Sequence, residues 1–287
     1  MQMKPFPVPV VPFGPGSQPD GDAVLDYMTM PQGMHTFATP SMPAHADAAS
    51  LDTARAVLRA VLAALDACGR GEQPAAIDLA QCDPATLRVL NEALGEGEVS
   101  ARIDSAGAGS VLIQETVFAG VWRVIADDAA HRCNRIEVGA APAALAEAAS
   151  ARAAQTLPVP GSHPAGVMNA PAILTEVQDQ VARWRAGDAP HVINLTLLPL
   201  SPEDTDWIDA VLGAGPVQVL SRGYGNCRIG STGIVHCWRV VYFNSQDTLI
   251  LNTIEITELP EVVRAAPEDL ADSRERLEQL IDWVEGA

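Results

Sequence analysis

Cysteine, aromatic residues and basic residues are all scarce in this chain. Its 287 residues include five cysteines and no CxxC pair, which excludes the dense disulfide framework of small secreted proteins and favours a reducing compartment. No run reaches the about 18 apolar residues that a membrane-spanning helix needs, and the start lacks a basic region followed by an apolar core. We therefore expect a soluble, cytoplasmic protein that is not exported.

Positive charge is the next deficit. The chain has 18 Lys and Arg against 36 Asp and Glu, which gives a formal charge of −18. A phosphate backbone or an anionic lipid surface would repel such a chain, so we expect neither nucleic acid nor a membrane as its partner. An acidic surface suits either solubility alone or a protein partner with a basic segment.

The common motifs of catalysis and cofactor binding are also missing. The sequence has no GxSxG elbow, P-loop, HExxH or GxGxxG after a strand, and its six histidines are scattered without metal-binding spacing. The glycine-rich letters GYGNCRIG lead into a strand, so they lack the helix N-terminus that holds phosphate. We expect no enzyme activity, cofactor or metal. An enzyme with a site between two halves, and an iron or iron–sulfur carrier that uses cysteines, are the alternatives.

Apolar residues make up 48% of the chain, which is enough for a sizeable core. Residues 1–49 differ from the remainder because they are rich in Pro, Gly and Met. So many prolines exclude a regular helix or strand and predict an extended segment. Methionine side chains repack around varied apolar surfaces, so this segment is a candidate contact with a partner.

The rest of the chain contains one pattern twice. Hydrophobic periods predict the order helix, strand, helix, strand, strand, strand in residues 50–152 and again in residues 172–287, where a C-terminal helix follows. The Pro- and Gly-rich residues 153–171 form a linker. Short turns between the last strands of each unit require antiparallel pairing. The predicted fold is therefore α+β, with two tandem similar units and mainly antiparallel sheets, which are either joined or separate.

Matching residues indicate that this pattern is a duplication. Asp83 corresponds to Ser201 at a shift of 118 (201 − 83), and each stands before a proline as a predicted helix N-cap. The Trp-Arg pair at 122–123 corresponds to the pair at 238–239, at a shift of 116 (238 − 122). The change in shift falls in turns, where insertions are tolerated.

The letters NCRIGSTGIVHCWRVVYF, residues 226–243, contain two cysteines and a histidine. We expect a strand over residues 233–243, which places His236 and Cys237 on opposite faces and prevents them from sharing a metal ion. The first copy has no cysteine here and has Gly120 in place of His236. Cys227 falls in a glycine-rich turn, so we expect it to be exposed and take it as the candidate reactive thiol.

Both copies keep Trp-Arg on one strand and Glu on the next. We expect Arg123 to pair with Glu137, and Arg239 with Glu255, on a partly exposed face, while the tryptophans face the helices. Arg123 and Arg239 are therefore candidate partner-binding residues.

The letters GPGSQP at 14–19, LDYMTMPQGM at 25–34 and the paired VWRV and CWRV strands together resemble the HupH/HyaF/HoxQ family of hydrogenase expression proteins, over nearly the whole chain. The resemblance implies a non-enzymatic chaperone for maturation of the iron–sulfur small subunit of an uptake nickel–iron hydrogenase, acting before twin-arginine export. The implied partners are the small-subunit precursor and a thioredoxin-like companion chaperone. The candidate contact residues in the N-terminal segment are Gly16, Ser17, Gln18, Pro19, Tyr27, Met28, Met30 and Met34.

Overall fold

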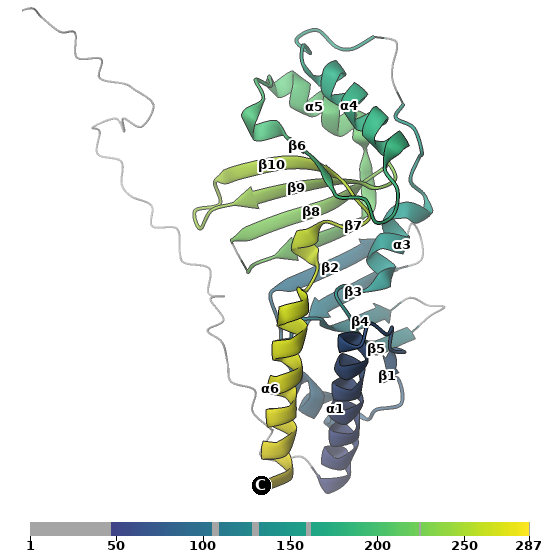
Figure 1. Ribbon diagram of the computed structural model, residues 1–287, viewed down its shortest axis with the longest axis vertical. Helices are drawn as coiled ribbons and strands as arrows, with labels where there is room; N and C mark the ends of the chain where they lie inside the picture. Colours follow the sequence, from purple (N-terminus) through teal and green to yellow (C-terminus); the bar gives the residue numbers. More distant parts are fainter. Residues whose placement is uncertain (1–46, 105–108, 128–131, 159–161, 224, 287) are drawn as a thin grey trace, which may run out of the picture. The chain divides into compact units, whose positions relative to one another are not determined.

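The computed structural model describes residues 47–104, 109–127, 132–158, 162–223 and 225–286 (Figure 1). In the first repeat the elements are α1 (Ala48–Gly69), β1 (Ile77–Asp78), α2 (Pro84–Leu94), β2 (Val99–Asp104), β3 (Ser110–Glu115), β4 (Val121–Asp127), β5 (Arg132–Val138) and α3 (Ala143–Ala151). In the second they are α4 (Ala170–Arg183), β6 (His191–Asn194), η1 (Leu195–Leu197), α5 (Pro202–Leu212), β7 (Ala214–Ser221), β8 (Asn226–Thr232), β9 (Cys237–Phe243), β10 (Leu249–Ile256), η2 (Glu261–Val263) and α6 (Pro267–Gly286).

The predicted helix caps are confirmed. The Asp83 carboxylate accepts hydrogen bonds from the backbone N–H groups of Ala85 and Thr86 at 2.7 and 3.0 Å, and α2 ends at Gly95 in a left-handed conformation. Ser201 and Asp204 form a reciprocal capping box at the start of α5. The same local chemistry therefore positions the second helix of each repeat against the sheet.

The two repeats share one ten-stranded antiparallel sheet in the order β1-β5-β4-β3-β2-β7-β8-β9-β10-β6. This order is the same read from either end, once each strand is exchanged for its repeat equivalent. At the centre Ala101 of β2 pairs with Val219 of β7, and these two residues also correspond at the shift of 118 (219 − 101). The repeats therefore meet through a self-complementary contact, as the two subunits of a symmetric dimer do.

Each repeat has one strand more than predicted. Residues 110–126, which supply one of the last three strands in the predicted order, form the hairpin β3–β4, and residues 226–243 form the hairpin β8–β9. Both turns use the αL conformation, at Gly120 with φ 77° and at His236 with φ 57°. This conformation costs a non-glycine residue about 1–2 kcal/mol. The prediction of a regular strand over 233–243 is therefore wrong, because the chain reverses just before Cys237.

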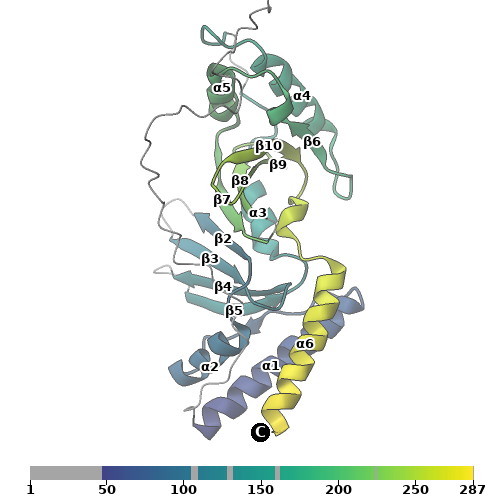
Figure 2. The same cartoon turned by 90° about the vertical axis from the view of Figure 1, so that its left-hand side faces the viewer.

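The two faces of the sheet are covered in different places. One face packs at its centre against α3 and η2, in a core that contains Trp122 and Trp238 and residues of both repeats. The other face packs at its ends, against α1 and α2 in the first repeat and against α4 and α5 in the second (Figure 2). The tryptophans face covering elements, as predicted. Each donates its indole N–H to an equivalent carbonyl, of Gly139 at 2.9 Å and of Thr257 at 3.2 Å.

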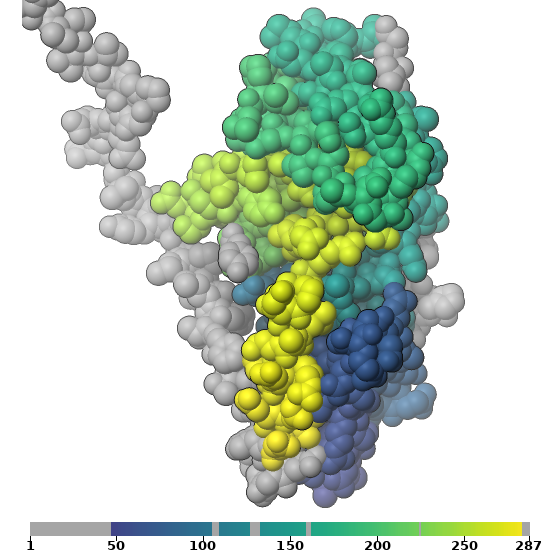
Figure 3. Space-filling model, in the orientation of Figure 1, coloured from purple at the N-terminus to yellow at the C-terminus, as the bar shows by residue number. Residues whose placement is uncertain are grey.

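Helix α6 crosses from the second repeat to the first. It lies beside α1 (Figure 3), where Leu277 and Ile281 join the core of the first repeat. The Arg274 guanidinium donates to Asp66 of α1 at 2.8 Å. The boundaries at 152 and 172 remain a proposal about where the duplicated units begin and end in the sequence. They do not divide the core, because residues on both sides of them pack together.

A buried carboxylate holds the end of the linker. Asp204 Oδ1 accepts hydrogen bonds from the backbone N–H groups of Met168, Asn169 and Ala170 at 2.8–2.9 Å. Burial opposes ionisation, but these bonds and one from the Ser201 N–H lower the pKa of Asp204 to about 2. This carboxylate therefore fixes the start of α4 against α5.

We expect Asp204→Ala to lower the free energy of unfolding by about 2 kcal/mol, because it leaves backbone N–H groups before and at the start of α4 unsatisfied and removes half of a capping box. Urea denaturation at neutral pH measures the change. Asp206→Ala, on the exposed side of the same helix, is the matched control and should change stability little. Equal losses for the two variants would contradict the role assigned to Asp204.

Candidate interaction surface

Among the described residues, no helix covers the middle of one sheet face. Strand alternation directs Ser100, Arg102, Leu112 and Gln114 toward this face, while the alternate residues enter the central core. Leu112 remains 52% exposed and Ile125 42% exposed. The exposed centre forms a groove of about 820 Å³ whose lining residues come from both repeats. We call it the sheet groove.

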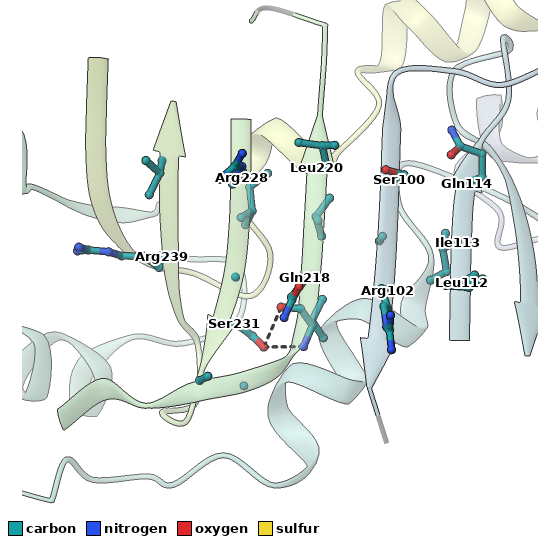
Figure 4. A pocket seen from close by; sticks show the side chains of 18 of the residues that line it. Ser100, Arg102, Leu112, Ile113, Gln114, Gln218, Leu220, Arg228, Ser231 and Arg239 are labelled. Atoms are coloured by element: carbon teal, nitrogen blue, oxygen red, sulfur yellow. Dashed lines mark hydrogen bonds between the residues drawn. The ribbon is translucent and has the colours of Figure 1, made fainter. Parts of the chain in front are cut away.

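Two rows of side chains cross the strands of the sheet groove (Figure 4). The strand registers place these side chains in line. From β4 to β9 the first row is Arg123, Gln114, Ser100, Leu220, Arg228 and Val241, and the second is Ile125, Leu112, Arg102, Gln218, Gly230 and Arg239. Each row therefore carries two arginines, one near an end of the groove and one farther along it.

Arg123 and Arg239 occupy equivalent places at opposite ends of the groove. Arg123 donates through Nε to Asn134 Oδ1 at 2.6 Å, and its Nη1 lies 3.5 Å from Asn91 Oδ1 of α2. Arg239 Nη2 lies 3.5 Å from Asp209 Oδ1 of α5, and Asp209 corresponds to Asn91 at the shift of 118 (209 − 91). Burial lowers the pKa of both guanidinium groups. Helices α2 and α5 therefore border the groove and orient its outer arginines.

The two inner arginines are more exposed. Arg228 stacks over the Phe243 ring, with its guanidinium carbon 4.8 Å from the ring centroid. Arg102 forms an ion pair with Asp104 at 2.6 Å, and its side chain is 58% exposed. Sequence comparison of the repeats missed both, because leucine stands at their equivalents, Leu112 for Arg228 and Leu220 for Arg102. The alternation of apolar and polar residues in VSARID, the sequence of β2, could have indicated that Arg102 lies on the exposed face.

The expected Arg–Glu pairs are wrong. Glu137 and Glu255 lie opposite Trp122 and Trp238 in the register, so they share the covered face and point away from the arginines. Glu137 instead accepts from Arg135 at 2.6 Å. Each glutamate is one register position away from the arginine expected to bind it, and neighbouring positions of a strand point to opposite faces of the sheet.

Cys227 is not in an exposed turn. It lies within β8, is 2% exposed and belongs to the central core. Burial raises the pKa of its thiol to about 12, and that of Cys237 to about 11. The glycines around it indicated a turn, but β8 begins at Asn226 and pairs on both sides. Exposure, the basis for the candidate reactive thiol, is therefore contradicted.

We expect iodoacetamide at neutral pH to leave Cys227 and Cys237 unmodified in the folded protein, since attack requires an accessible thiolate. The half-buried Cys68, Cys82 and Cys133 should react first. Mass spectrometry of timed digests, with the urea-unfolded chain as control, measures the order. Labelling of Cys227 as fast as Cys133 would mean that β8 opens locally.

Cys82 and Cys133 line a smaller cavity of about 260 Å³ next to Ile125. Arg135 Nη1 donates to Cys133 Sγ at 2.9 Å. Across the residues that the structure describes, no three His, Cys, Asp or Glu side chains gather closely enough to hold a metal ion. In the same residues, no helix combines the length and apolar character needed to cross a bilayer. The candidate contacts Gly16, Ser17, Gln18, Pro19, Tyr27, Met28, Met30 and Met34 lie outside the described residues.

Comparison with known proteins gives matches along nearly the whole chain. The model for the family described as HupH hydrogenase expression protein, C-terminal conserved region, matches residues 51–156 and 167–284, one match to each repeat. The hydrogenase expression/formation protein HoxQ of Cupriavidus necator is 54% identical, over 98% of this chain and 99% of its own. HupH of Rhodobacter capsulatus is 46% identical over 97% and 98%. The hydrogenase-1 operon protein HyaF of Escherichia coli is 35% identical over 95% of each.

Proposed function

Because this chain belongs to the HupH family of hydrogenase expression proteins, we propose that it is an accessory protein for hydrogenase maturation that binds the iron–sulfur small-subunit precursor before export. Similarity over the full length to proteins named for hydrogenase expression and formation supports the maturation role. The small subunit as client, binding in the cytoplasm and a thioredoxin-like companion chaperone are the finer parts of the proposal. In this proposal the protein acts by binding and not by catalysis.

The observation that carries the binding role is the sheet groove. It spans both repeats, and each repeat contributes to it the arginine that the duplication retained, Arg123 or Arg239. Exposed leucine and isoleucine beside arginine are typical of surfaces that bind proteins. The methionine-bearing N-terminal residues 1–49 are the second proposed contact, because methionine adapts to varied apolar surfaces.

Co-purification tests this function. We expect the tagged full-length chain, co-expressed with the small-subunit precursor of its hydrogenase, to retain that precursor, and the double variant Arg123→Gln, Arg239→Gln to retain less. Arg152→Gln, at an exposed arginine outside the groove, is the control for loss of an arginine charge elsewhere on the surface.

Two results would overturn the proposal. One is recovery of the precursor no greater than that of an unrelated exported iron–sulfur protein. The other is near-stoichiometric iron in the anaerobically purified chain alone, which would favour a carrier. Deletion of residues 1–46 without loss of the precursor would remove only the N-terminal segment from the proposed contact.

A further inference from the structure

We propose that the sheet groove binds an acidic, partly apolar segment of a partner polypeptide, in extended form across the strands. Carboxylates of the segment meet the arginines, and its apolar side chains meet Leu112, Ile125 and Leu220. This inference deepens the proposed function and rests on it only for the identity of the partner. The chemistry of the ligand follows from the charges and spacing in the groove.

The charge of the groove is opposite to that of the chain. The chain carries −18, yet the charged residues that line the groove are four arginines and Glu96. Within the described residues, Arg123 bonds to neutral amide oxygens and Arg228 lies over a ring, so neither has a carboxylate partner. Guanidinium groups form their strongest hydrogen bonds with carboxylates and other oxyanions. The groove therefore attracts an anionic ligand that the rest of the surface repels.

Within each row, the two arginines are too far apart for one small anion. Between the rows, Arg228 and Arg239 stand on adjacent strands, but Arg228 stacks on Phe243 and Arg239 contacts Asp209. From Arg123 on β4 to Arg228 on β8 there are four strand steps, or about 19 Å at the usual strand spacing. From Arg102 on β2 to Arg239 on β9 there are three, or about 14 Å. An extended polypeptide rises about 3.3 Å per residue, so carboxylates about four to six residues apart match both spans.

The apolar floor favours a polypeptide over a nucleic acid. Leu112 and Ile125 adjoin Arg102 in one row, and Leu220 stands beside Arg228 in the other. A segment that carries both acidic and apolar side chains satisfies these neighbours together. A nucleic acid would bring a continuous row of phosphates against the −18 chain.

Two acidic side chains already compete for the groove. Asp104 is 2.6 Å from Arg102, and Asp209 is 3.5 Å from Arg239. A ligand carboxylate adds to or displaces these contacts, so Arg123 and Arg228 should contribute most of the attraction. Because Arg228 is exposed, we expect binding to weaken as salt is raised.

The test uses the full-length chain and a fluorescein-labelled extended peptide of about twelve residues. Glu and Leu take turns at every second position and Ser stands between them, so that the carboxylates and the apolar side chains point to one face. Fluorescence anisotropy measures its binding. The same peptide with Gln or Lys in place of Glu is the ligand control. We expect the Glu peptide to bind at least about tenfold more tightly than either, and the double variant Arg123→Gln, Arg228→Gln to lose that difference, whereas Arg152→Gln keeps it.

Gly230 offers a second, independent variant. It lies opposite Arg239 in the register, and a Cβ atom added there meets no atom within 4 Å. Gly230→Glu should place a carboxylate beside Arg239 and weaken the Glu peptide by about tenfold or more, while Gly230→Gln, of the same size, should weaken it about threefold or less. Thermal melting confirms that each variant is folded.

Equal binding of the Glu and Lys peptides would overturn the inference. So would unchanged binding of the Glu peptide by the folded double variant Arg123→Gln, Arg228→Gln and by folded Gly230→Glu. So would tighter binding of a single-stranded oligonucleotide than of the Glu peptide, which would make the groove a phosphate site. If the Glu peptide binds as expected but the small-subunit precursor does not co-purify, this inference stands and the proposed function fails. If the precursor co-purifies but the Glu peptide does not bind as expected, the inference fails and the proposed function stands.

Discussion

Trp238→Ala should lower the free energy of unfolding by about 4 kcal/mol, the largest single loss that we expect in this protein. Trp238 is 1% exposed in the central core, where no collapse of neighbours can refill the volume of an indole. The variant also leaves the Thr257 carbonyl without the indole N–H that donates to it at 3.2 Å. Urea denaturation followed by circular dichroism measures the loss.

The duplication supplies the control for this experiment. Trp122→Ala removes the equivalent ring, also 1% exposed, and should cost a similar amount. Trp207→Ala removes a partly buried ring from α5 and should cost clearly less. Since the central core contains residues of both repeats, each core variant should unfold in one transition. Two separate transitions would show that the repeats are independent and would contradict the shared core.

Glu115→Gln should remove most of the loss of stability that the wild-type protein shows between about pH 5 and pH 8. Glu115 is 7% exposed, and burial raises its pKa from 4.5 to about 7. The hydrogen bond that its carboxylate accepts from the Gly120 N–H at 3.1 Å opposes the rise. Repulsion from Glu98 and Asp269 adds to the rise. The buried carboxyl group is therefore protonated in the folded protein under conditions where the unfolded chain is ionised.

The direction of the pH effect follows from the raised pKa. The folded state holds the proton more tightly than the unfolded state, so the stability that it contributes is complete below pH 4.5 and is lost as pH rises through about 7. A shift of this size corresponds to about 3 kcal/mol, which the wild-type protein should lose across this range and Glu115→Gln should keep. Urea midpoints at the two ends of the range measure the difference.

The second repeat again provides the comparison. Ser231 stands at the position of Glu115, opposite Trp238, and its hydroxyl accepts from the Val217 N–H at 3.0 Å. Glu115→Ser should therefore also remove the pH dependence, while leaving a small cavity that lowers stability at every pH. If wild type and both variants lose stability in parallel as pH rises, another group is responsible.

Local chemistry made much of the fold predictable. Asp83 and Ser201 mark helix starts because a side-chain oxygen at an N-cap and a following proline act within a few residues. The Trp-Arg strands were found because the two copies confirm each other. The β8–β9 hairpin was missed for a similar local reason: His236 stands where the first copy has Gly120, and histidine gives no warning of a left-handed turn.

The site was only half predictable. Arg123 and Arg239 were found because both repeats retain them, and alternation placed them away from the tryptophans correctly. Arg102 and Arg228 have leucine at their equivalents, so comparing the copies directed attention away from them. Their convergence depends on the registers of β2 with β7 and of β7 with β8, and the first of these joins residues more than a hundred positions apart.

By itself, the sequence determined the duplication, the α+β class, the antiparallel pairing of strands joined by short turns, and the inward-facing tryptophans. Helix caps, hydrophobic periodicity and short turns are properties of neighbouring residues. Only the tertiary structure decided that β2 pairs with β7 into one sheet, that α6 returns to α1, that Cys227 is buried and that the described residues leave the sheet groove uncovered. These outcomes depend on which distant surfaces exclude water together, and that choice is made by packing across the whole chain.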